Sequence, residues 1–204
     1  MLDRILDFLK NRYFIGGVAL VALILVGNSV MNYYSEKANE IEFKKFVKIN
    51  DEFSIEESDS NELLNNLDLD FDSFGYELIA KTILAKKAVD EGYLDLALNL
   101  FLEMHQLIKD EGISKTTKNI LKAQYVENIV RIYMEKNDFD GGSNFIKENT
   151  NNSLRFHELA GDFYKFFDKS DDSVFHYDKA LTFDIDEAQK NIINLKKPKQ
   201  SWKK

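Results

Sequence analysis

The chain has 204 residues and carries a formal net charge of −8 at neutral pH. That length suits one compact domain with appendages, and 44% apolar residues indicate a folded rather than a disordered chain. The negative balance argues against non-specific nucleic-acid binding, which needs Lys and Arg to neutralise phosphates. Because cysteine is absent, disulfides, thiolate catalysis and iron–sulfur clusters are excluded. A single proline and only nine glycines favour long helices.

The N-terminal region contains an uncharged stretch, residues 13–35. About 20 helical residues at 1.5 Å each cross the hydrocarbon core of a bilayer, so this stretch predicts a transmembrane helix. Basic residues precede it, so the positive-inside rule predicts a cytoplasmic N-terminus over residues 1–12 and export of everything that follows the span. A cleaved signal peptide is the competing interpretation, but its best cleavage site, Gly27-Asn28-Ser29, is poor.

Two segments are expected between this span and the main domain. Residues 36–48 have helical spacing and predict a juxtamembrane helix. Residues 49–73 contain nine acidic residues and no basic one, which is typical of a solvated acidic linker. Three aspartates in the linker have the spacing that opens a calcium-binding loop. Ser73 and Ile79 replace the glycine and the last acid of that pattern, so we prefer the linker.

From residue 74 to residue 197, apolar residues recur at helical spacing between short turns. Pairs of mostly small residues twelve positions apart occur three times: Ala85 and Ala97, Val130 and Gly142, and Gly161 and Ser173. In tetratricopeptide repeats, such residues let the two helices of a repeat approach closely. The sequence therefore predicts an all-α fold, with an N-terminal transmembrane helix followed by a tetratricopeptide-like helical repeat solenoid. Residues 198–204 form a basic tail.

The residue types needed for catalysis do not form a recognisable pattern. His105, His157 and His176 make neither an HxxxH nor an HExxH motif, so ordinary helix histidines are expected in place of metal ligands. The sequence has no Gly-rich phosphate loop and no GxSxG elbow. We therefore expect no catalytic residues, no cofactor, no metal site and no enzyme activity.

A tetratricopeptide array usually binds its partner on the concave face, which the first helix of each pair forms. Its mixed charge fits a protein partner better than a peptide terminus; an ordinary solvated helix face is the alternative. The candidate protein-binding groove consists of Ile79, Thr82, Lys86, Gln124, Glu127, Arg131, Arg155, Glu158, Asp162 and Lys165.

The chain resembles the YfgM family of Gram-negative inner-membrane proteins. The matching stretches are DFLKNRYFIGGVALVALILVGNSVMNYY, YELIAKTILAKKAVDEGYLDLALNLF, and LAGDFYKFFDKSDDSVFHYDKAL with the helical segment 187–195. The resemblance implies an ancillary subunit of the SecYEG translocon that works with a membrane-anchored prolyl-isomerase-like periplasmic chaperone. It also implies a single-pass protein of the bacterial inner membrane with a cytoplasmic N-terminus and a periplasmic C-terminal domain. The acidic segment 49–73 departs most from the family.

In the function implied by this resemblance, the protein binds partner or client proteins on the periplasmic side. It then assists their transfer to chaperones without catalysis. Two alternatives use the same repeat architecture. One is an envelope-assembly or division scaffold, and the other is a released periplasmic chaperone, which requires signal cleavage.

Overall fold

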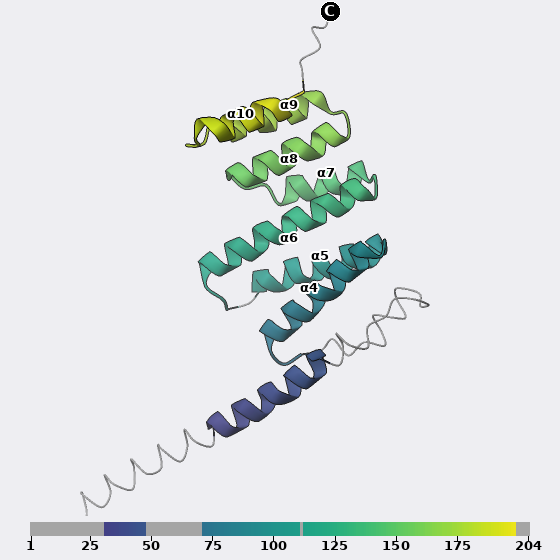
Figure 1. Ribbon diagram of the computed structural model, residues 1–204, viewed down its shortest axis with the longest axis vertical. Helices are drawn as coiled ribbons and strands as arrows, with labels where there is room; N and C mark the ends of the chain where they lie inside the picture. Colours follow the sequence, from purple (N-terminus) through teal and green to yellow (C-terminus); the bar gives the residue numbers. More distant parts are fainter. Residues whose placement is uncertain (1–30, 48–70, 111, 199–204) are drawn as a thin grey trace, which may run out of the picture. The chain divides into compact units, whose positions relative to one another are not determined.

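The structure, a computed structural model, describes residues 31–47, 71–110 and 112–198 (Figure 1). The chain divides into two compact units, which are residues 1–53 with 71–76 and residues 54–70 with 77–204. The described parts of both units contain helices and turns and no strand.

The structure contradicts the predicted transmembrane helix. In the described part of the chain, no helix is both long and apolar enough to cross a membrane. Residues 13–30 of the expected span lie outside the described residues, and residues 31–35 begin a helix that continues to residue 47. Acidic and basic residues interrupt the apolar run from Glu36 onward, so this helix lacks the apolar length of a span. The assignment to a bacterial inner membrane, with a periplasmic domain, rested on that span and is corrected with it.

The other N-terminal predictions fall only partly on described residues. Residues 36–47 of the expected juxtamembrane segment are helical. Residues 1–12, 49–70 of the acidic linker and 199–204 of the basic tail lie outside the described residues, and these boundaries stay predictions.

In the first unit, Glu42 is buried between the helix over residues 31–47 and the segment 71–76. Its carboxylate accepts hydrogen bonds at 3.4 Å from the backbone N–H groups of Asp72 and Ser73. Helix α4 begins directly afterwards, at Phe74. The N–H groups at a helix start have no partner within the helix, so Glu42, some thirty residues away in the sequence, caps this start.

The helices α4 to α10 follow one another along the chain (Figure 1). Helix α5 packs on α6, α6 on both α7 and α8, α8 on α9, and α9 on α10. Lys81 and Thr82 of α4 contact Glu103 and Met104 of α5. The repeat pairs are therefore α4/α5, α6/α7 and α8/α9 with α10 as a closing helix, which confirms the repeat part of the predicted all-α fold. The helices are α4 Phe74–Asp90, α5 Leu94–Asp110, α6 Lys115–Glu135, α7 Phe139–Glu148, α8 Leu154–Phe166, α9 Ser170–Ala180 and α10 Glu187–Lys196.

Local sequence sets the ends of these helices. Helices α6, α7, α8 and α10 each begin after a Ser or Asp whose side chain accepts a hydrogen bond from the backbone N–H three residues later. Gly92, between α4 and α5, has a φ of 84°, a conformation that glycine adopts without steric cost. Asn137 and Asp168 take positive φ in the corresponding turns of the next two pairs, because Asn and Asp tolerate positive φ better than most other non-glycine residues do.

Small residues let the helices approach closely. A Cβ atom added to Gly142 would lie 2.4 Å from the ring of Phe163, and one added to Gly161 would lie 2.8 Å from the ring of Tyr177. The Ser173 hydroxyl donates a hydrogen bond of 2.9 Å to the Gly161 carbonyl, across the predicted twelve-residue spacing. The first contact brings α7 close to α8, and the other two bring α8 close to α9.

Candidate protein-binding groove

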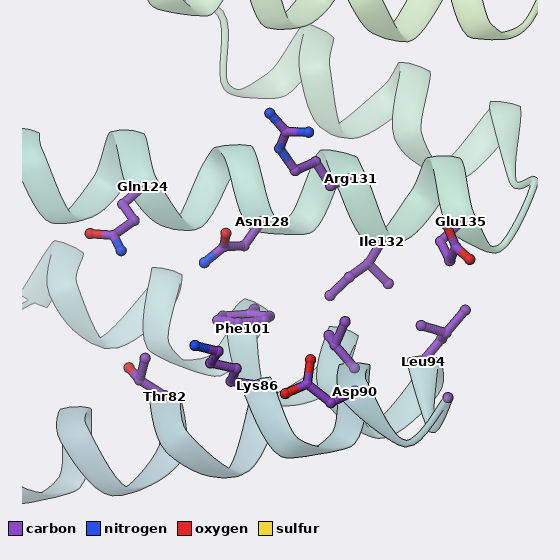
Figure 2. Close-up of a pocket in the computed structure, with 12 residues that line it drawn as sticks. Thr82, Lys86, Asp90, Leu94, Phe101, Gln124, Asn128, Arg131, Ile132 and Glu135 are labelled. Carbon is purple, nitrogen blue, oxygen red and sulfur yellow. The ribbon is translucent and has the colours of Figure 1, made fainter.

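Helices α4, α5 and α6 enclose a cavity of about 530 Å³. Apolar side chains from α5 and α6 lie between the two first helices of neighbouring repeats, and polar side chains of α4 and α6 stand on either side (Figure 2). We call this cavity the α4–α6 groove. Its lining residues are Thr82, Lys86, Val89, Asp90, Gly92, Leu94, Phe101, Gln124, Asn128, Arg131, Ile132 and Glu135.

The apolar part of the groove is built from core residues. Phe101 of α5 and Ile132 of α6 are each only 4% exposed, and Leu94 at the start of α5 is half-buried. Tyr125 packs against Phe101 with ring centroids 6.0 Å apart. These side chains hold a fixed floor because the core behind them is closely packed.

Thr82 of α4 has its hydrogen-bonding capacity filled by the protein itself. Its hydroxyl donates to the Leu78 carbonyl at 2.6 Å and lies 2.9 Å from the Tyr125 hydroxyl. Burial raises the pKa of Tyr125, so the phenol stays protonated at neutral pH and donates to Thr82. Thr82 therefore ties α4 to α6 and sets the width of the groove at that end.

Apart from Arg131, the other polar side chains of the groove have no such partners. Within the part of the chain that the structure describes, they make no hydrogen bond or ion pair with another side chain. Those on α4 face those on α6 across the apolar floor (Figure 2). A surface that keeps five polar side chains without protein partners around an apolar floor offers both orientation and apolar contact to a ligand. The five are Lys86, Asp90, Gln124, Asn128 and Glu135.

Arg131 differs from these five because its guanidinium is occupied. It donates to Glu127 Oε1 through Nε at 3.1 Å and Nη2 at 2.9 Å, and it points away from Lys86 (Figure 2). Arg155 of α8 donates to the other oxygen of Glu127. Burial acts to raise the pKa of Glu127, but the two arginines outweigh it and hold that pKa below its ordinary value. Glu127 is thus an ionised bridge between α6 and α8.

The other three α8 residues of the predicted groove contact the closing helix. Lys196, the last residue of α10, contacts Asp162 at 3.1 Å and Glu158 at 3.8 Å. Lys165 donates to the Lys196 carbonyl at 2.6 Å, and the Tyr177 hydroxyl donates to Asp162 at 2.5 Å. The chain itself therefore fills this part of the face.

The structure places nine of the ten predicted residues in three groups and leaves Ile79 outside them. Thr82, Lys86, Gln124 and Arg131 line the α4–α6 groove. Glu127 and Arg155 form the bridge to α8, and the remaining α8 residues bind α10. Ile79 is 51% exposed on α4. A role for any of them in binding stays a prediction.

Sequence reasoning missed several groove residues that share helix faces with predicted ones. Asp90, Asn128 and Glu135 each lie four positions after a predicted residue, and helical periodicity places positions i and i+4 on one face. Extending the register by one turn would have found them. Phe101 and Leu94 come from α5, the second helix of the repeat, and no first-helix pattern indicates them.

The histidines lie apart from the groove. His157 of α8 and His176 of α9 face each other with their Nδ1 atoms 3.1 Å apart. Burial lowers the pKa of both, that of His176 to about 4. Burial also lowers the pKa of His105 to about 4, and its buried Nε2 has no hydrogen-bond partner. Among the described residues, no three His, Cys, Asp or Glu side chains come together as metal ligands.

Comparison with known families agrees with this architecture. Residues 10–199 match the family described as a tetratricopeptide repeat-like domain. The chain belongs to this family. No curated protein and no solved structure matches it significantly. Membership indicates protein–protein interaction, since such repeat domains are typically non-catalytic scaffolds. It does not distinguish the YfgM family from other tetratricopeptide-like families.

Proposed function

We propose that this protein is a non-catalytic scaffold that binds a partner protein in the α4–α6 groove. The observation that carries the proposal is the set of five polar side chains without protein partners around the floor of Phe101, Leu94 and Ile132. Four of the five are exposed and Asn128 is half-buried, so all five can reach the backbone and side chains of a partner that lies over the apolar floor. The cavity is also large enough to take side chains of a partner segment.

Site-specific photocrosslinking tests this proposal. A photoreactive benzoylphenylalanine at Gln124, in the groove, should give discrete adducts in cells that express the full chain. The matched control places the same group at Asn144, an exposed residue of α7. Equal adducts from both positions, or none from Gln124, would contradict binding in the groove.

The partners named by the YfgM resemblance make a finer proposal. They are the SecYEG translocon and a prolyl-isomerase-like chaperone, and the protein would assist the transfer of secreted chains between them. Support comes from the two matching stretches within the repeat domain and from the tetratricopeptide-like architecture. Mass spectrometry of the Gln124 adducts tests it: SecY or the isomerase-like chaperone is expected. Adducts with envelope-assembly or division proteins instead would favour the scaffold alternative.

A further inference from the structure

The chemistry of the concave face changes along α4 and α6. On α4, Ile79, Thr82, Lys86 and Asp90 lie on one face at helical spacing, and Ile79 is 51% exposed. On α6, Ile120 is 62% exposed and lies one turn before Gln124. Each helix therefore presents an exposed isoleucine at its N-terminal side and a carboxylate, Asp90 or Glu135, towards its C-terminal end.

The charge of the groove is also unevenly distributed. Arg131 shares Glu127 with Arg155, and Lys86 is the only basic side chain lining the cavity that has no acidic partner in the described part of the chain. Asp90 and Glu135 both lack a basic partner there. These two carboxylates stand at one end of the groove and can attract a cationic group, while an anionic group placed between them would meet two like charges.

The helix geometry sets the distance between the two ends. Eleven residues separate Ile79 from Asp90, which corresponds to about 16 Å at 1.5 Å per residue. An extended chain rises about 3.3 Å per residue, so roughly five residues of an extended segment cover this distance. Leu94 and Ile132 lie towards Glu135 at the carboxylate end (Figure 2), where they offer an apolar surface to the aliphatic part of a long basic side chain.

We propose that the groove selects an extended partner segment with a bulky apolar side chain at one end and a basic side chain about five residues away. The apolar side chain lies against Ile79 and Ile120, and the basic one lies between Asp90 and Glu135. Backbone groups between them bond to Gln124, Asn128 and Lys86. This inference rests on the proposed function and adds the chemistry of the partner to it.

The test measures fluorescence anisotropy of labelled peptides with the full chain. The probe is fluorescein-Gly-Leu-Ser-Ala-Gly-Ser-Arg-Arg-Gly, in which the first Arg follows the Leu by five residues. One companion peptide carries Glu in place of both Arg, and a second lacks two of the central residues. We expect the probe to bind at least tenfold more tightly than either companion. Equal affinities would overturn the proposal.

Charge reversal in the protein provides the sharper comparison. The double variant Asp90→Lys/Glu135→Lys should lose at least tenfold in affinity for the Arg peptide and gain affinity for the Glu peptide. The control Glu148→Lys/Asp184→Lys makes the same charge change at exposed residues outside the groove, and it should keep the preference for Arg. If both double variants change the preference for the Arg peptide equally, the net charge of the protein explains binding, and the assignment of the basic side chain to Asp90 and Glu135 is contradicted.

Failure of this inference can be told apart from failure of the proposed function. Adducts from Gln124 without any preference among the peptides would leave the groove as a binding site and refute the stated partner chemistry. Absence of both adducts and peptide binding would refute both. Circular dichroism and urea midpoints of the variants check that they fold, which is expected because Asp90 and Glu135 make no stabilising pair.

Discussion

The two halves of the concave face use the same kind of helix surface in different ways. Between α4 and α6, polar side chains surround an apolar floor and have no protein partners among the described residues. Between α8 and α10, the acids Glu158 and Asp162 hold the basic end of the closing helix. The comparison shows that a repeat surface is available to a partner only where the chain has not already satisfied its polar groups.

Removing the buried ring of Tyr177, in the α8–α10 half, should have the largest effect on stability. Tyr177→Ala deletes a fully buried side chain that packs on Gly161 and donates to Asp162. We expect a loss of about 3–5 kcal/mol in the free energy of unfolding, as for other large core truncations. Urea denaturation followed by circular dichroism measures it. Tyr177→Phe, which keeps the packing of the ring, should lose only about 1 kcal/mol. If it lost as much as Tyr177→Ala, the hydroxyl rather than the packing of the ring would account for the stabilisation.

Acid should weaken both halves through their histidines. The pKa values of His105 on α5 and His176 on α9 are about 4, below the ordinary 6.5. Between these values the unfolded chain binds more protons than the folded chain, so stability is complete above pH 6.5 and falls as the pH drops towards 4. For the fully buried His105 the loss is roughly 3 kcal/mol.

Urea midpoints between pH 7.5 and pH 4 measure this dependence. His105→Leu should reduce the pH dependence of the free energy of unfolding, because leucine binds no proton in either the folded or the unfolded chain. An unchanged slope in this variant would assign the acid sensitivity to other groups.

Reversing the charge of Lys196, at the end of α10, should have a moderate effect on stability. Lys196→Glu replaces two attractive contacts with repulsion from Glu158 and Asp162. These side chains are partly exposed and screened by solvent, so we expect a loss of about 1 kcal/mol. The control Lys147→Glu makes the same change at an exposed residue of α7. If both variants behave alike in urea denaturation, the contacts of Lys196 contribute nothing specific.

Neutralising the carboxylates of the first half should change stability least. Asp90→Asn and Glu135→Gln each remove a charge that has no protein partner, so the free energy of unfolding should stay within about 0.5 kcal/mol of the parent. A decrease of more than 1 kcal/mol in urea denaturation would reveal a stabilising role and weaken the contrast between the two halves.

The repeat fold could be predicted from the sequence because its determinants are local. Helical periodicity gave the helices, and Gly161 and Ser173 at a spacing of twelve indicated the close helix pair that the structure shows. One feature of the fold depends on a contact that is distant in the sequence. The cap that Glu42 provides to α4 joins residues thirty positions apart, and no local pattern indicates such a pair.

The candidate site could be predicted only in part for the same reason. The first-helix register found Thr82, Lys86, Gln124 and Arg131. It could not show that Lys196 of the closing helix occupies the acids of α8, because that contact joins residues 34 positions apart. The predicted membrane helix is contradicted, because no helix among the described residues is long and apolar enough to cross a membrane, and the described helix from residue 31 carries charged residues from Glu36 onward.

The hydrogen bond from Ser173 to Gly161 has a consequence for local opening of the chain. It joins α8 to α9 only, and α10 packs on α9 at the end of the stack. In such linear arrays each repeat depends on its immediate neighbours, so the terminal pair opens without carrying the first repeats with it. Amide protons of α10 should therefore exchange with solvent faster than those of α6, and the α4–α6 groove persists while the C-terminal end frays.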